Sequence, residues 1–196
     1  ILRGVMKMNK KVIIGVIVAV FVLVVGGVVF CFSNPTIKED IQTENNGGST
    51  YSKRVASDGA KMQKGDSSMP TRVLKEGTRI NMYFGDKVIP GILNDSKTAQ
   101  AFIEMLPLTI HESRYSHDFC GSMDDFLPFD EKDERYGWLN GDIAVGTNVP
   151  WFTILFADEE ISEQYGNLVN IGVIDCELST ISQLNGSFDV LIELAE

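Results

Sequence analysis

The sequence predicts a mainly β domain, an antiparallel barrel or sandwich, preceded by a single transmembrane helix. Short runs of alternating apolar and polar residues recur from residue 79 to the C-terminus. Only one stretch of that part shows the convincing 3.6-residue apolar spacing of an amphipathic helix. Near the N-terminus, residues 12–32 form a run without any charged side chain. Many short strands with one or two helices favour a barrel or sandwich over a parallel sheet.

The first two strands are expected at residues 79–84 and 87–93, joined by the tight turn Gly85-Asp86. The same alternation predicts further strands at 108–113, 142–145, 151–156, 169–174 and 188–194. Residues 117–138 are polar and rich in turn-forming residues. We interpret this segment as a long excursion across the surface of the domain.

The amphipathic helix is expected to begin after Asn94 or Asp95, because both residues are good N-caps. Pro107 is expected to end it. Its apolar face is formed by Ala99, Phe102, Ile103 and Leu106. A second, short helix is expected at residues 178–184.

The apolar run 12–32 is long enough to cross a membrane, since about 20 helical residues span the hydrocarbon core of about 30 Å. It is longer than the apolar region of a cleavable signal peptide, and Phe30 before Cys31 does not fit a lipoprotein signal. Residues 1–11 before it carry four basic residues and no acidic one. We therefore expect a signal anchor with a cytoplasmic N-terminus and an extracytoplasmic C-terminal part.

The rest of the chain divides by composition. Residues 33–71 are rich in small polar residues and are expected to form a flexible tether, and residues 72–196 to form the domain. That domain carries 8 Lys and Arg against 22 Asp and Glu, a net charge of −14. We expect no nucleic-acid partner, because binding to phosphates depends on basic side chains. Membrane association is expected to occur only through 12–32.

Cys120 and Cys176 are the cysteines of the domain. In an extracytoplasmic protein they can form a disulfide, and the alternative is two buried reduced thiols. His117 and Cys120 have the spacing of zinc ligands, but a zinc site needs four ligands. The acidic residues of 124–134 lack the alternating pattern of a calcium loop. We expect no metal site and no cofactor.

Residues 77–196 contain several short motifs that occur in the same order in a known family of proteins. Residues 96–102, Ser-Lys-Thr-Ala-Gln-Ala-Phe, resemble the Pro-Lys-Thr-Ala-x-x-Phe of the first cyclophilin helix. Arg114 and Phe119 have the spacing of the family's arginine and phenylalanine. Residues 146–154 and 168–174 are similar to two later cyclophilin strands. The resemblance is closest to the small bacterial cyclophilin-like group, through Leu-Pro-Leu-Thr at 106–109 and Asn-Gly-Asp at 140–142.

The resemblance implies a closed antiparallel β-barrel and a ligand site. The positions that match that site are Arg114, Phe119, Ser122, Trp151, Thr153 and Leu168. In a prolyl isomerase, Arg114 would weaken the amide resonance as a hydrogen-bond donor and Phe119 would form the wall of the proline pocket. Three pocket residues differ from the family's pattern: Ser122 replaces a glutamine, Thr153 a phenylalanine and Leu168 a histidine. The alternative role of Arg114 is a surface ion pair with Asp118 or Asp124.

The first functional hypothesis is a membrane-anchored, extracytoplasmic cyclophilin-like domain that binds a peptide or a small molecule without catalysis. The second is an extracytoplasmic peptidyl-prolyl isomerase that uses Arg114 and Phe119. The third is a purely structural interaction module.

Overall fold

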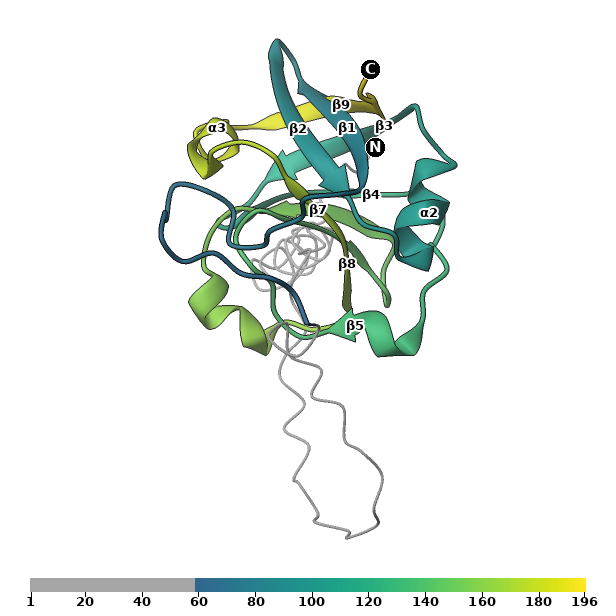
Figure 1. Cartoon of the computed structure of the whole chain (residues 1–196). Helices are drawn as coiled ribbons and strands as arrows, with labels where there is room; N and C mark the ends of the chain where they lie inside the picture. The colour runs from purple at the N-terminus through teal and green to yellow at the C-terminus, as the bar shows by residue number, and fades with distance from the viewer. Residues whose placement is uncertain (1–58) are drawn as a thin grey trace, which may run out of the picture. The chain divides into compact units, whose positions relative to one another are not determined.

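Eight antiparallel strands close into a barrel in the computed structural model, which describes residues 59–196 (Figure 1). The strands are β1 (Thr78–Phe84), β2 (Lys87–Leu93), β3 (Leu108–Arg114), β4 (Asp118–Ser122), β5 (Glu134–Arg135), β6 (Asp142–Gly146), β7 (Trp151–Leu155), β8 (Leu168–Ile174) and β9 (Ser187–Leu194). The helices are α2 (Lys97–Ile103) and α3 (Leu178–Ser182), with the 3-10 helices η2 (Glu131–Asp133) and η3 (Glu159–Gln164).

The strand order around the barrel is β2-β1-β9-β3-β4-β7-β6-β8. Pairing between β2 and β8 closes it, with Ile92 opposite Val173, and the short β5 adds to β8 outside the ring. Closure leaves the eight strands of the ring without a free edge. The mainly β fold and the closed barrel predicted from the sequence are therefore confirmed.

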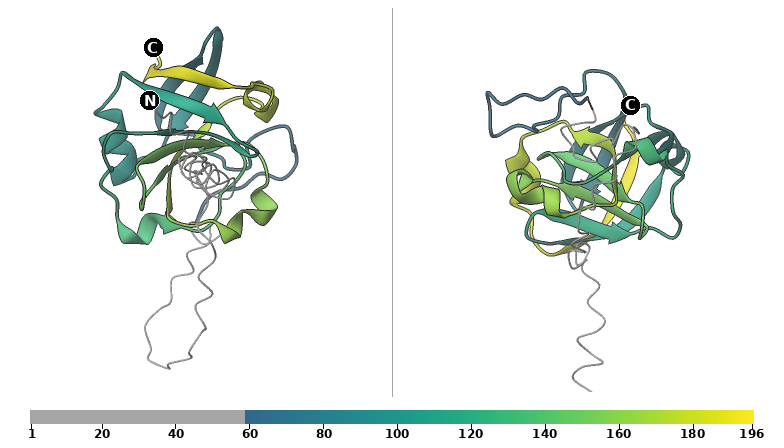
Figure 2. Two further views of the ribbon diagram at one scale, coloured as in Figure 1. Left: turned by 180° about the vertical axis from the view of Figure 1, so that it is seen from behind. Right: turned by 90° about the horizontal axis from the view of Figure 1, so that it is seen from below.

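The two α-helices belong to opposite ends of the barrel. α2 connects β2 to β3, and α3 connects β8 to β9, so the chain direction places α3 at the end where β3 finishes and β4 begins. The helices lie on opposite sides in both the front and the back view (Figures 1 and 2). Inside the barrel, the fully buried side chains include Ile80, Met82, Phe84, Phe119, Phe152, Ile154, Val169, Val190 and Ile192.

The N-cap of helix α2 lies one residue after Asp95 and two residues after Asn94, the two predicted caps. Its N-cap is Ser96, whose Oγ accepts a hydrogen bond of 3.1 Å from the Ala99 backbone N–H. Asn94 instead uses its side chain to connect two segments: Oδ1 accepts from the Ser96 N–H, and Nδ2 donates to the Asn170 carbonyl at 3.0 Å. The predicted cap at Asn94 or Asp95 was wrong because Asn94 already bonds to β8.

The prediction of a surface excursion over residues 117–138 was wrong for its first part. Residues 118–122 form β4, which lies between β3 and β7 and is mostly buried. Gly121 permits the close approach of β3, since a Cβ there would lie 2.4 Å from the His111 carbonyl oxygen. The other predicted strands and the short second helix are confirmed, with ends that differ by a residue or two.

Residues 59–71, which the sequence assigns to the tether, lie against the barrel. Met62 and Arg72 form an antiparallel bridge, and the Thr71 N–H donates to the Asn140 carbonyl at 2.8 Å. Pro70 packs on Gly141, whose φ of +98° also favours glycine. The predicted transmembrane residues 12–32 lie outside the described residues, and within 59–196 no helix has the length and apolarity to cross a membrane.

Cys176 is half-buried and carries a free thiol. The disulfide with Cys120 that the sequence left open is therefore not formed.

Candidate functional site

Arg114 and Phe119 are direct neighbours across the β3–β4 pair and point into the α3 end of the barrel. Phe119 is fully buried. Its ring centroid lies 5.1 Å from that of Phe84, 5.9 Å from Phe188 and 6.2 Å from Phe156. The structure thus brings the two predicted residues together, but it places the Phe119 ring in the core instead of on an open pocket wall.

Arg114 lies over an aromatic ring at the same end of the barrel. Its guanidinium carbon is 4.8 Å from the Phe156 centroid, the geometry of a cation–π contact. Nη1 is buried and has no hydrogen-bond partner. Arg114 forms no ion pair with any residue in 59–196, so the predicted alternative, a pair with Asp118 or Asp124, is not formed.

Two buried carboxyl groups flank Arg114 in sequence. Glu112 is fully buried, and neither of its carboxyl oxygens has a hydrogen-bond partner. Burial raises its pKa well above 4.5, and the charge of Asp118 raises it further. Its surroundings therefore favour the protonated, neutral form of the Glu112 carboxyl group.

Asp118 lies on the other face of the sheet from Phe119, because side chains alternate along β4. Its Oδ2 accepts a hydrogen bond of 2.8 Å from Thr153 Oγ1, and Oδ1 is buried without a partner. Burial raises the pKa of Asp118 to about 7, although the bond from Thr153 lowers it. Asp118 therefore changes its charge near neutral pH.

The other predicted site residues are distributed over the outer face of β4, β7 and β8. Ser122, the last residue of β4, is opposite Trp151, the first residue of β7; Ser122 is exposed and Trp151 is half-buried. Thr153 is fully buried and bonds to Asp118 and to the Phe119 carbonyl. Leu168 begins β8 and is separated from Thr153 by β6. These residues do not meet Arg114, which points to the opposite face of the sheet.

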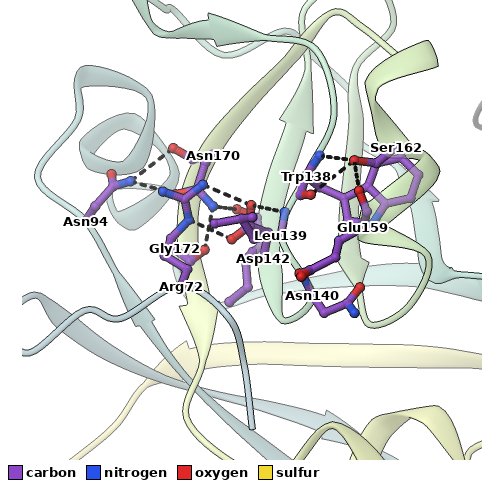
Figure 3. Close-up of polar contacts among 11 residues, drawn as sticks. Arg72, Asn94, Trp138, Leu139, Asn140, Asp142, Glu159, Ser162, Asn170 and Gly172 are labelled. Carbon is purple, nitrogen blue, oxygen red and sulfur yellow. Dashed lines mark hydrogen bonds and ion pairs between the residues drawn. The ribbon is translucent and has the colours of Figure 1, made fainter. Parts of the chain in front are cut away.

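Leu168 lines a small recess together with a buried ion pair. Arg72 Nε donates to Asp142 Oδ1 at 2.6 Å and its Nη2 donates to Oδ2 at 3.1 Å (Figure 3). The same Oδ2 accepts from the Leu139 N–H at 3.1 Å. This bidentate pair fixes the segment before β1 onto β6. The recess has a volume of about 10 Å³, which suits one water molecule and is too small for a side chain.

A larger groove lies on the other side of Arg72. It has a volume of about 340 Å³ and runs between residues 63–74, which we call the strap, and the seam where β2 pairs with β8. Its lining residues are Gln63, Asp66, Met69, Pro70, Arg72, Val73, Leu74, Ile92, Val173, Ile174 and Asp175. The strap forms the dark blue loop beside the barrel in Figure 1.

The strap keeps its shape through internal and external hydrogen bonds. Gln63 Nε2 donates to the Asp66 carbonyl at 2.9 Å and to the Pro70 carbonyl at 3.0 Å, which closes the loop. The Ser68 carbonyl accepts from the Leu178 N–H at 2.8 Å, which ties the strap to α3. Together with the Arg72–Asp142 pair, these bonds preform the groove.

Residues that commonly bind metals are not gathered at one point in the part of the chain that the structure describes. His117 packs instead against aromatic rings, 4.8 Å from Trp138 and 5.6 Å from Tyr165 between centroids. Burial lowers its pKa.

The sequence profile of the cyclophilin-like family matches residues 82–193. The chain belongs to this family. The solution structure of the hypothetical protein AF2241 from Archaeoglobus fulgidus has a similar fold, with a TM-score of 0.50 and 17% sequence identity over 63% of this chain and 100% of that chain. No curated protein matches the chain.

The match to the cyclophilin-like family includes Arg114, Phe119 and the outer face, but it begins after the strap. The groove is therefore built by residues on both sides of that boundary, and family membership does not assign it a role. The strap was not predicted from the sequence, which assigned these residues to the tether and the start of the domain. A signal was available, because Met69, Val73 and Leu74 are apolar residues at the end of an otherwise polar segment.

Proposed function

We propose that this cyclophilin-like chain is a single-pass membrane protein whose extracytoplasmic domain binds a peptide or small ligand without catalysing prolyl isomerisation. The anchor is the apolar run 12–32, and the basic residues of 1–11 support a cytoplasmic N-terminus. The anchored arrangement rests on these sequence features alone. With this topology, the domain meets only ligands that are present outside the cytoplasm.

The groove under the strap is the observation that supports ligand binding. Its volume of about 340 Å³ falls within the range of about 300–1,000 Å³ that is usual for ligand pockets. It combines an apolar floor with a few polar groups, and its wall is held by hydrogen bonds before any ligand arrives. A preformed site loses less conformational entropy on binding.

Prolyl isomerisation is the alternative function, and the position of Phe119 argues against it. A proline ring needs an open apolar pocket within reach of the donor. Phe119 is fully buried among three other phenylalanines, so it does not face a ligand. Arg114 Nη1 has no hydrogen-bond partner and could act as the donor. Isomerisation also needs a pocket that holds the proline ring, and Phe119 does not provide one.

The binding proposal is tested with the full chain in detergent micelles and a panel of fluorescent peptides, with and without proline. Val73→Trp places an indole in the groove without changing its floor, and Val88→Trp is the control because Val88 is an exposed valine of β2 outside the groove. We expect saturable binding, measured by fluorescence anisotropy, that Val73→Trp weakens and Val88→Trp retains. Binding that both variants retain would contradict the location of the site.

The same preparation tests for catalysis in a proline-peptide isomerisation assay. We expect the uncatalysed rate, with and without Arg114→Ala. A faster rate that Arg114→Ala abolishes would establish the isomerase function in place of the proposed one.

The topology is tested by adding protease to intact cells stripped of any outer layers. We expect the domain to be digested without permeabilising the membrane. Protection of the domain until the membrane is opened would contradict the extracytoplasmic location.

A further inference from the structure

The floor of the groove is aliphatic. Ile92 and Val173 are opposite each other where β2 meets β8, and only 4% and 3% of their surfaces are exposed. Met69, Val73 and Leu74 from the strap face the groove and are half-buried. Because the floor is already almost covered, a ligand that fills the groove gains mainly by removing its own aliphatic surface and that of these half-buried strap residues from water, at about 25 cal/mol per Å².

Carboxylates provide the available charge of the groove. Asp66 and Asp175 both line it and both are exposed. The third charged lining residue, Arg72, has its guanidinium bound by both oxygens of Asp142. The groove therefore presents two acidic groups beside an aliphatic floor, and its one cation is already neutralised.

The Asp66 carboxylate is held in its charged form. Its Oδ1 accepts from the Ser68 N–H at 2.9 Å and from the Ser68 hydroxyl at 2.6 Å. These two bonds favour the ionised form and lower the pKa of Asp66.

Asp175 has one ion-pair partner, which does not block the groove. Arg79 Nη1 lies 2.7 Å from Asp175 Oδ2, and the two side chains are 60% and 43% exposed. Exposed pairs of this kind contribute between about 0 and 1 kcal/mol, so a cationic ligand can share or displace Arg79. The net charge of −14 over residues 72–196 adds a long-range attraction for cations.

We propose that the groove under the strap binds a peptide through a lysine or arginine side chain flanked by aliphatic residues. The aliphatic neighbours lie on Ile92 and Val173, and the cationic group reaches Asp66 and Asp175. This inference rests on the proposed ligand-binding function and specifies its ligand.

The experiment uses the full chain in micelles and three fluorescent peptides that differ at one position between two leucines. That position carries lysine, the uncharged norleucine or glutamate. Affinities are measured by anisotropy for the wild type, for Asp66→Asn/Asp175→Asn and for the control Asp124→Asn/Asp125→Asn. The control removes the same formal charge from exposed residues outside the groove.

For the wild type we expect the lysine peptide to bind about tenfold more tightly than the norleucine peptide, and the glutamate peptide to bind most weakly. The preference for lysine falls to within about twofold in Asp66→Asn/Asp175→Asn and is kept in the control. Retained binding of the norleucine peptide shows that the groove variant is folded. The lysine preference also decreases at high salt, since exposed charges are screened.

Equal affinity for the lysine and norleucine peptides would overturn the inference but leave the proposed function standing, provided that Val73→Trp still weakens binding. Equal loss of the lysine preference in both double variants would overturn it too, because the general field of the domain would then be the cause. If none of the peptides binds, the proposed function fails as well.

Discussion

Replacing Asp118 with asparagine is expected to stabilise the domain at alkaline pH and to remove much of its pH dependence. The pKa of Asp118 is about 7 in the folded protein and near 3.8 when the chain is unfolded. Below pH 3.8 both states hold the proton. As the pH rises from 4 to 7, the unfolded state releases it while the folded state keeps it, so stability is lost over this range.

The size of the effect follows from that difference in pKa. A change from 3.8 to about 7 corresponds to about 4 kcal/mol of unfolding free energy lost between pH 4 and pH 8. Asparagine does not ionise, and its Oδ1 can still accept from Thr153. The asparagine N–H₂ group takes the place of the carboxylate oxygen that has no partner in Asp118. Burying this unsatisfied donor lowers the unfolding free energy by about 1 kcal/mol. The net gain at pH 8 is therefore about 3 kcal/mol, with no gain at pH 4.

The assay is urea unfolding of the full chain in micelles, followed by tryptophan fluorescence between pH 4 and pH 8. Both tryptophans, Trp138 and Trp151, lie in the domain, so the signal reports on the barrel. His117 has a lowered pKa and acts in the opposite direction, losing stability as the pH falls, so only the difference between variant and wild type is interpreted. The exposed Asp125→Asn is the control. Parallel pH curves for Asp118→Asn and wild type would refute the reasoning.

Substitutions at Phe119, at the Arg72–Asp142 pair and at Ser96 test the fold by the same unfolding assay. Phe119→Ala leaves a cavity in the aromatic cluster and should lower the unfolding free energy by about 3–5 kcal/mol; a loss below about 1 kcal/mol would mean that Phe119 is not in the core. Arg72→Ala leaves the Asp142 carboxylate buried without its ion-pair partner and should lower the unfolding free energy by about 3–5 kcal/mol. If the loss in the double variant with Asp142→Ala equalled the sum of the two single losses, a direct pair would be contradicted. Ser96→Ala should cost about 1 kcal/mol and Ser96→Gly only a few tenths, whereas equal losses would contradict the cap.

Local patterns were sufficient to predict most of the barrel. Alternation and the turn at Gly85, whose φ is +64°, predicted β1 and β2 almost to the residue. β4 was missed because its inward positions are Phe119 and Gly121, a single large apolar residue and a glycine. The need for a glycine there depends on the closeness of β3, which is a tertiary property.

The candidate site was less predictable, because sequence patterns did not distinguish inward from outward polar residues. The polar run at the end of β3 resembles a solvated strand end, yet Glu112 is inside the barrel. The resemblance assigned Arg114 and Phe119 to one site, and the two residues are neighbours across β3 and β4, but the full burial of the Phe119 ring was not predicted. The strap resembles a tether by composition; its order comes from contacts such as Arg72 with Asp142, 70 residues away.

The most direct test of the account is the methyl NMR spectrum of the full chain in micelles, with labelled methionines, during titration with the lysine peptide. Met69 lines the groove, whereas Met82 is fully buried inside the barrel. We expect the Met69 resonance to shift to saturation with the binding curve and the Met82 resonance not to move. Saturation of the peptide without any change at Met69 would contradict the claim that the groove is the ligand site.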